Sequence, residues 1–196
     1  TPFGRGFDVL MGGGRKNFMP VTQRDPEEDD KVGERLDGRD LIADWKQRHA
    51  GGVYVWNKAQ LDAAPLDKPL LALFQPDHMQ FEYERPKDTA GEPTLADMTR
   101  AAIARLSRNG NGYVLLVEAG RIDHANHYGN AYRALSDTVA MSDAVRAANE
   151  ATSVDDTLII VTADHSHVLN FAGYPKRGNP ILGKVRGGSG EDDDGG

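Results

Sequence analysis

The 196-residue sequence has no cysteine, which excludes disulfides, thiolate zinc sites and a cysteine nucleophile together. It also has no apolar run near the roughly 20 residues that a membrane-spanning helix requires. Basic residues are in deficit, because 23 Lys and Arg face 30 Asp and Glu, and the formal net charge is −7. Such an acidic chain is poorly suited to bind nucleic acid by neutralising phosphates. We therefore expect a soluble globular protein with no nucleic-acid partner and no membrane span.

The two ends of the chain differ from the rest in composition. The first four residues, Thr1 to Gly4, have neither the basic start nor the apolar stretch of a signal peptide. From Gly183 the sequence is rich in glycine and ends in a run of acidic residues. We expect one α/β domain over residues 1–183 and a flexible acidic tail over residues 184–196.

Apolar and amphipathic segments alternate along the domain. Short apolar runs predict buried strands at residues 7–11, 113–117 and 157–161, with further candidates at 70–74 and 53–56. Helical spacing of apolar residues predicts helices at 40–49, 95–108 and 131–152. This alternation indicates a mostly parallel sheet with helices on both faces, a three-layer α/β/α fold that is incomplete at its edges. The polar segments 15–39 and 76–93 are expected to be long surface loops.

Four of the six histidines lie directly beyond two predicted strands. His124 and His127 follow the strand at 113–117, and His165 and His167 follow the strand at 157–161. In open α/β sheets, ligands bind beyond the carboxyl ends of the strands. Acid and histidine pairs occur at both strand ends, so a metal site is the favoured interpretation.

The ligand types suit zinc and magnesium. Imidazole and carboxylate without sulfur are typical of catalytic zinc, and carboxylate oxygen with water suits magnesium. On a helix, Asp123 would share one face with His127, but His124 is also a near neighbour of His127, so spacing does not choose between the two histidines. Glu118 could hold another ion through oxygen. A lone strand-end glutamate is, however, more often a surface charge.

Asp164 and His165 are adjacent and would diverge in a regular strand, but they can converge at an irregular strand end. His167 could support a metal-bound residue rather than bind metal itself. The glycine run before Arg15 lacks the spacing of a phosphate-binding loop, and a tight turn explains it better.

Two segments resemble alkaline phosphatases: Val117 to His124 (V-E-A-G-R-I-D-H) and Val161 to His167 (V-T-A-D-H-S-H). Further blocks resemble the same family in the same order, at residues 11–16, 36–39, 54–57, 131–135 and 173–175. The resemblance covers nearly the whole chain up to about Gly183. These blocks outside the metal motifs disfavour a sulfatase, a phosphodiesterase or a phosphoglycerate mutase, which are similar to alkaline phosphatases only at their metal sites.

The resemblance implies a two-zinc, one-magnesium centre that hydrolyses phosphate monoesters. It assigns Glu118 to magnesium, Asp123 and His127 to the first zinc, and Asp164 and His165 to the second. His124 and His167 would lie beside these ligands. In such a centre the two zinc ions stabilise the attacking and leaving oxygens of the transferred phosphoryl group. The resemblance also implies a homodimer and a periplasmic or secreted location.

The family's serine nucleophile has no counterpart here, because no serine of the chain has the Asp-Ser-Ala context and Ser166 matches a non-nucleophilic position. We therefore assign no catalytic residue and expect the chain alone to bind zinc weakly and to turn over phosphate esters slowly or not at all. A metal-binding fragment without catalysis is the alternative. Some relatives carry a calcium site, whose positions would correspond to Glu27, the Phe74 carbonyl, Gln75 and Glu92. An amide replaces a carboxylate at Gln75, so no calcium site is assigned from the sequence.

Overall fold

The computed structural model describes residues 6–170 and 175–184. Its sheet has three parallel strands, β1 (Val9–Gly12), β2 (Val53–Val55) and β3 (Leu70–Leu73), in the order β1-β3-β2. All four residues of the central strand β3 are buried. A continuous apolar run of this kind is typical of a parallel strand that is covered on both faces.

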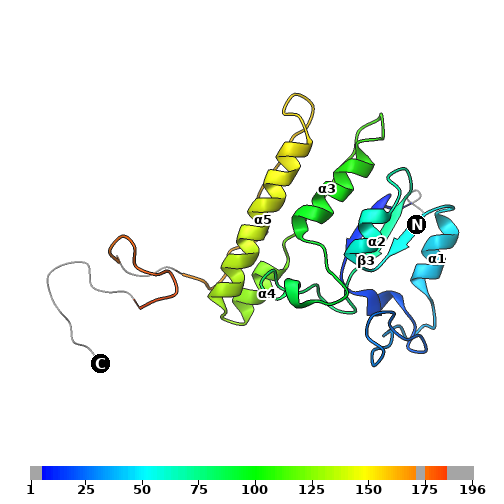
Figure 1. The fold of residues 1–196 in the computed structure, drawn as a ribbon, viewed down its shortest axis with the longest axis horizontal. Coiled ribbons are helices and arrows are strands. Elements are labelled where there is room, and N and C mark those ends of the chain that lie inside the picture. Colours follow the sequence, from blue (N-terminus) through cyan, green and yellow to red (C-terminus); the bar gives the residue numbers. More distant parts are fainter. Residues whose placement is uncertain (1–5, 171–174, 185–196) are drawn as a thin grey trace.

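In the described part of the chain, five α-helices lie beside the sheet or extend from it (Figure 1). They are α1 (Leu41–Arg48), α2 (Lys58–Ala63), α3 (Leu95–Leu106), α4 (Arg121–His127) and α5 (Ala131–Ala151), with two 3-10 turns, η1 (Arg15–Phe18) and η2 (Arg85–Lys87). The start of α3 is fixed by a capping box between Thr94 and Asp97, and Asn130 caps α5 by accepting a hydrogen bond from the Arg133 N–H. Helix α5 packs along α3 and against α4.

Alternate side chains of β3 enter two separate cores. Leu70 and Ala72 belong to a cluster that includes residues of α2 and is packed against α3. Leu71 and Leu73 belong to another cluster that includes Ile42 of α1. Helices therefore lie on both faces of the sheet, which confirms the predicted α/β/α class in a small, open form.

Two predicted strands are absent from this sheet. Residues 113–117 and 157–161 are non-helical and pair with no strand within the described residues. Burial alternates over residues 113–116, as in a strand with one covered face, but Val114 is 97% exposed and Ile160 is 76% exposed. The expectation of buried strands was wrong here, because such a strand is buried only when neighbouring strands lie beside it.

The segment 15–39 is more than the surface loop expected from its composition. Arg15 is fully buried and donates hydrogen bonds to Asp25, to Glu27 and to the Leu73 carbonyl at the end of β3. Polar composition normally predicts exposure to water. In this network each charge is instead satisfied by a partner within the fold, so the segment can be buried. The segment 76–93 also differs from its prediction, since it contributes the buried side chain of Phe81.

The glycine run before Arg15 forms the predicted tight turn. A Cβ at Gly13 would lie 2.3 Å from the Asp77 carbonyl oxygen, so only glycine fits this approach. Gly14 has a φ of 78°, a left-handed conformation that glycine adopts without steric cost.

Arg15→Ala is expected to lower the free energy of unfolding by about 3–5 kcal/mol, because it leaves Asp25 buried without its counter-charge. The measurement is urea denaturation followed by circular dichroism. Arg39→Ala is the matched control, since it removes a more exposed pair with Asp44 and should cost less than about 1 kcal/mol. Equal losses for the two variants would contradict the structural role of the buried network.

Within the described residues, no helix is long and apolar enough to cross a membrane. Of the predicted acidic tail, only Lys184 lies within the described residues. The division into a domain over residues 1–183 and a tail over residues 184–196 stays a prediction.

Candidate metal centre

Helix α4 carries the first acid and histidine pair. It has only seven residues, and its N-cap, Gly120, offers no side chain to the free N–H groups of the first turn. The Asn126 amide donates to the Ile122 carbonyl, and the helix ends where the Asn130 N–H reaches the Ala125 carbonyl. Ala125 is fully buried, so one face of α4 is anchored and the other presents its polar side chains.

The carboxylate of Asp123 is the centre of the candidate site. Its Oδ2 lies 3.3 Å from Nε2 of His127 on the same helix. Its Oδ1 lies 3.8 Å from Nε2 of His165 and 3.5 Å from Nε2 of His167. The two histidine motifs, well separated in sequence, therefore meet at one carboxylate.

Backbone hydrogen bonds give His165 and His167 different chemistry. Nδ1 of His165 lies 2.8 Å from the Ser166 carbonyl, to which it must donate, so Nε2 of the neutral ring keeps a free lone pair. In His167, Nδ1 accepts the Val168 N–H at 2.8 Å, so the neutral ring carries its proton on Nε2. His165 thus offers a ligand atom toward Asp123, and His167 offers a hydrogen-bond donor.

His124 faces away from this group. Its Nδ1 accepts a hydrogen bond from Nη1 of Arg121 at 2.9 Å, and its ring lies 4.4 Å from the ring of His78. Burial lowers the pKa of His124, and the nearby His78 and Arg121 lower it further. Of the two histidines that spacing left open, His127 is the one beside Asp123.

The remaining predicted ligands are placed differently. The Asp164 side chain is 87% exposed, with Oδ2 3.4 Å from Nε2 of His165 and Oδ1 accepting the His165 N–H. The hydrogen bond to the Ser166 carbonyl and the charge of Asp164 raise the pKa of His165. Glu118 is exposed and forms no hydrogen bond or ion pair with any described residue. The structure brings Asp164 to His165 but leaves Glu118 apart.

The donor set fits a divalent cation such as zinc. One ligand atom each from Asp123, His127 and His167 lies within 4.8 Å of the others. In the neutral tautomer set by the Val168 N–H, Nε2 of His167 carries a proton, so Asp123 and His127 are the members of this group that offer a free ligand atom. Oxygen and imidazole nitrogen together are the donors of catalytic zinc sites. His167 therefore lies in direct contact distance of Asp123. In the sequence, only its position two residues after His165 indicated a place near the site.

A second polar cluster gathers around Glu92. The Gln75 amide nitrogen lies 3.5 Å from Oε1 of Glu27, and the Glu92 carboxylate accepts the Gln80 N–H. Burial, followed by the charges of Asp88 and Glu27, raises the pKa of Glu92 to about 7.

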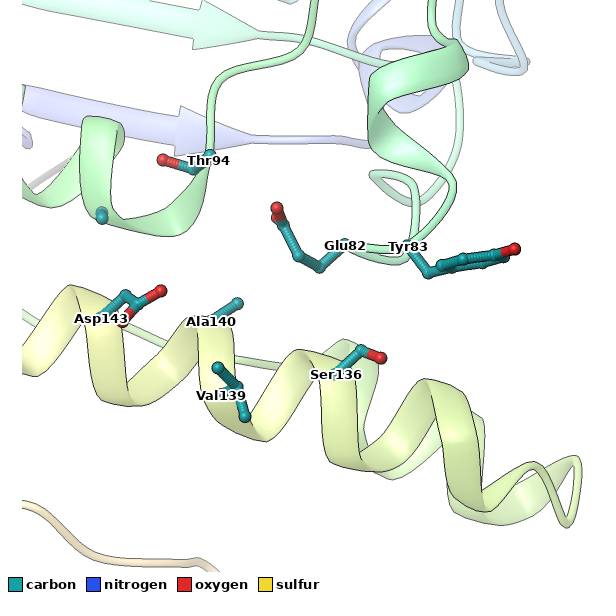
Figure 2. Close-up of a pocket in the computed structure, with 8 residues that line it drawn as sticks. Glu82, Tyr83, Thr94, Ser136, Val139, Ala140 and Asp143 are labelled. Carbon is teal, nitrogen blue, oxygen red and sulfur yellow. The ribbon is translucent and has the colours of Figure 1, made fainter. Parts of the chain in front are cut away.

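A cavity of about 440 Å³ lies between the start of α3, the loop before it and α5 (Figure 2). Its polar groups already have partners. Glu82 pairs with Arg85, Asp143 pairs with Arg146, and the Ser136 hydroxyl donates to the Tyr132 carbonyl. None of the candidate metal ligands lines this cavity, so the metal centre remains the candidate site.

Comparison with known proteins gives a consistent result. The family model described as alkaline phosphatase matches residues 3–194. The chain is 45% identical over 190 residues to the membrane-bound alkaline phosphatase of Bombyx mori, covering 93% of this chain and 34% of that protein. It is 48% identical over 188 residues to the tissue-nonspecific isozyme of Felis catus, covering 91% and 35%.

The solved alkaline phosphatase of Thermus thermophilus superposes with a TM-score of 0.60 at 35% identity, covering 72% of this chain and 26% of the other. The chain spans about a third of the length of the curated relatives that it matches. With the family model covering nearly all of its residues, this chain belongs to the alkaline phosphatase family.

Proposed function

We propose that this chain supplies part of the metal centre of an alkaline phosphatase that hydrolyses phosphate monoesters with two zinc ions and one magnesium ion. The observation that carries the proposal is the meeting of both histidine motifs at Asp123, with Nε2 of His165 3.8 Å from one oxygen of that carboxylate. The Ser166 carbonyl fixes the tautomer of His165 through Nδ1, as hydrogen bonds to the second ring nitrogen do for histidines that bind metal.

The proposed roles follow the resemblance. Asp123 and His127 hold the first zinc, Asp164 and His165 the second, and Glu118 the magnesium. Bound metal ions would polarise the phosphoryl oxygens and lower the pKa of the attacking group.

His167 and His124 support these ligands. His167 keeps a proton on Nε2 facing Asp123 and thereby orients that carboxylate. His124 is held by Arg121 on the other side of α4. Ser166, whose carbonyl fixes the His165 ring, has a structural role rather than a nucleophilic one. In the complete enzyme we infer a homodimer that acts in the periplasm or outside the cell, as the resemblance implies.

The chain alone is expected to bind zinc and to show no hydrolysis of nitrophenyl phosphate above that of the metal buffer, because it contains no serine in the nucleophile context. Zinc content after dialysis and turnover with added zinc and magnesium are the measurements. Asp164→Ala should lower zinc content, and Asp143→Ala on α5 is the control that should not. Robust turnover would show that a nucleophile is present after all, and a chain that retains no zinc would refute the proposed centre.

A further inference from the structure

Helix α4 needs support from outside itself. Seven residues form less than two full turns, and helices this short are unstable in isolation. Because α4 has no side-chain N-cap, it also lacks the stabilisation that such a cap gives to the start of a helix. The positions of Asp123 and His127 therefore depend on whatever holds α4 against the rest of the fold.

The side chain of Phe81 is the main contact that holds α4 against the rest of the fold. It is 4% exposed and forms a core cluster with Ala125 of α4 and Ala134 of α5. The guanidinium carbon of Arg121, the first residue of α4, lies 3.7 Å from the centre of its ring. The guanidinium carbon of Arg133, in the first turn of α5, lies 4.7 Å from the same centre. One ring thus contacts the starts of both helices.

The two arginines differ in how their charge is matched. Nε and Nη2 of Arg133 both donate to Oε1 of Glu84. Arg121 forms no ion pair with any described carboxylate, and its buried Nε has no hydrogen-bond partner. Arg121 donates one hydrogen bond to His124 within α4, and the ring of Phe81 is its stacking partner from outside that helix. Such contacts are strongest when they are desolvated.

We propose that Phe81 is a positioning residue for the metal centre: by binding the Arg121 guanidinium, it fixes the start of α4 and so sets the positions of Asp123 and His127. Arg121 also holds the His124 ring through Nδ1, which keeps that imidazole away from Asp123. The inference rests on the proposed function, because it concerns the affinity of the same metal ligands.

The test measures metal binding by the whole chain, with Zn²⁺ and Co²⁺ as probes. Phe81→Leu keeps an apolar side chain but removes the ring face, and we expect zinc affinity to fall ~10-fold, the lower end for loss of a supporting residue. The visible absorption spectrum of bound Co²⁺ should change in band position or intensity. Phe81→Tyr keeps the ring face and should restore both properties to those of the unmodified chain.

Tyr83→Leu is the matched control. Tyr83 lies in the same loop and has Lys87 over its ring, but its ring partner is Tyr132 of α5 and not a residue of α4. This variant should leave zinc affinity unchanged. Arg121→Lys should lower zinc affinity in the same way as Phe81→Leu, because lysine keeps the charge but lacks the flat group that stacks on a ring.

The possible failures are distinguishable. If the unmodified chain binds zinc and Phe81→Leu binds it equally well with an unchanged Co²⁺ spectrum, Phe81 only stabilises the fold and the inference is wrong. If Phe81→Leu fails to fold, an unchanged affinity in Arg121→Lys would overturn it instead. If the unmodified chain binds neither metal, the proposed function itself fails.

Discussion

Asp123→Ala is expected to weaken zinc binding by at least ~100-fold, the upper end of what loss of a supporting residue costs. Among the described residues, this carboxylate is the one group within ion-pairing reach of all three histidines, His127, His165 and His167. Its removal takes away a proposed ligand and leaves three imidazoles to repel one another when protonated. Competition titration with a chromophoric zinc chelator gives the affinity.

The control for Asp123→Ala is Asp143→Ala, which removes a helix carboxylate whose partner is Arg146. That variant should bind zinc as the unmodified chain does. His167→Ala adds a second comparison, because a supporting donor should cost ~10–100-fold and a direct ligand more. Retention of full zinc affinity by Asp123→Ala would place the metal elsewhere and end the proposal for this site.

The chain is expected to self-associate through residues 113–117 and 157–161, and lysine in both segments should prevent this. Val114 is 97% exposed and Ile160 is 76% exposed, and segments with unpaired backbone groups are templates for pairing with another chain. The double variant Val114→Lys, Ile160→Lys should reduce the apparent mass at least ~2-fold, because charged lysines block strand pairing at exposed edges. Light scattering after size-exclusion chromatography measures this mass.

Val139→Lys on α5 controls for the added charge, since Val139 is also exposed but lies on a helix. Its apparent mass should equal that of the unmodified chain. A monodisperse monomer for the unmodified chain would contradict the expectation. In a longer polypeptide of the family, additional strands could cover the same two segments.

Helices α1, α3 and α5 and the central strand could be predicted because their signals are local, whereas α2 (Lys58–Ala63) was not predicted. Residues 131–152 were predicted to be helical and α5 covers Ala131–Ala151, and residues 70–74 were predicted to be a strand and contain β3. For α5 the apolar spacing is a local signal. For β3 the apolar run is also local, and the strand forms because β1 and β2 pair with it on both sides.

The remaining features depend on distant partners. Arg15 is buried only because Asp25 and Glu27 fold back over it, and nothing in its local sequence shows this. The segment at 113–117 has the composition of a buried strand, but burial requires neighbours that the described residues do not supply.

The candidate site was predictable in its residue types and not in their roles. Asp123 and the four nearby histidines stand out in the sequence, but the ring orientation of each histidine does not. His165 and His167 differ because one Nδ1 meets a carbonyl and the other meets an N–H. That difference depends on the path of the backbone, which the sequence pattern alone does not give.

The two acid and histidine pairs of the candidate site differ in how firmly the fold holds them. Asp123 and His127 belong to a helix that is packed against α5 and anchored by Ala125. Asp164 and His165 lie on an exposed segment without a strand partner in the described part of the chain. If the centre binds two zinc ions as proposed, this difference would favour stepwise loading, in which the ion at α4 binds first and the exposed segment orders around the second.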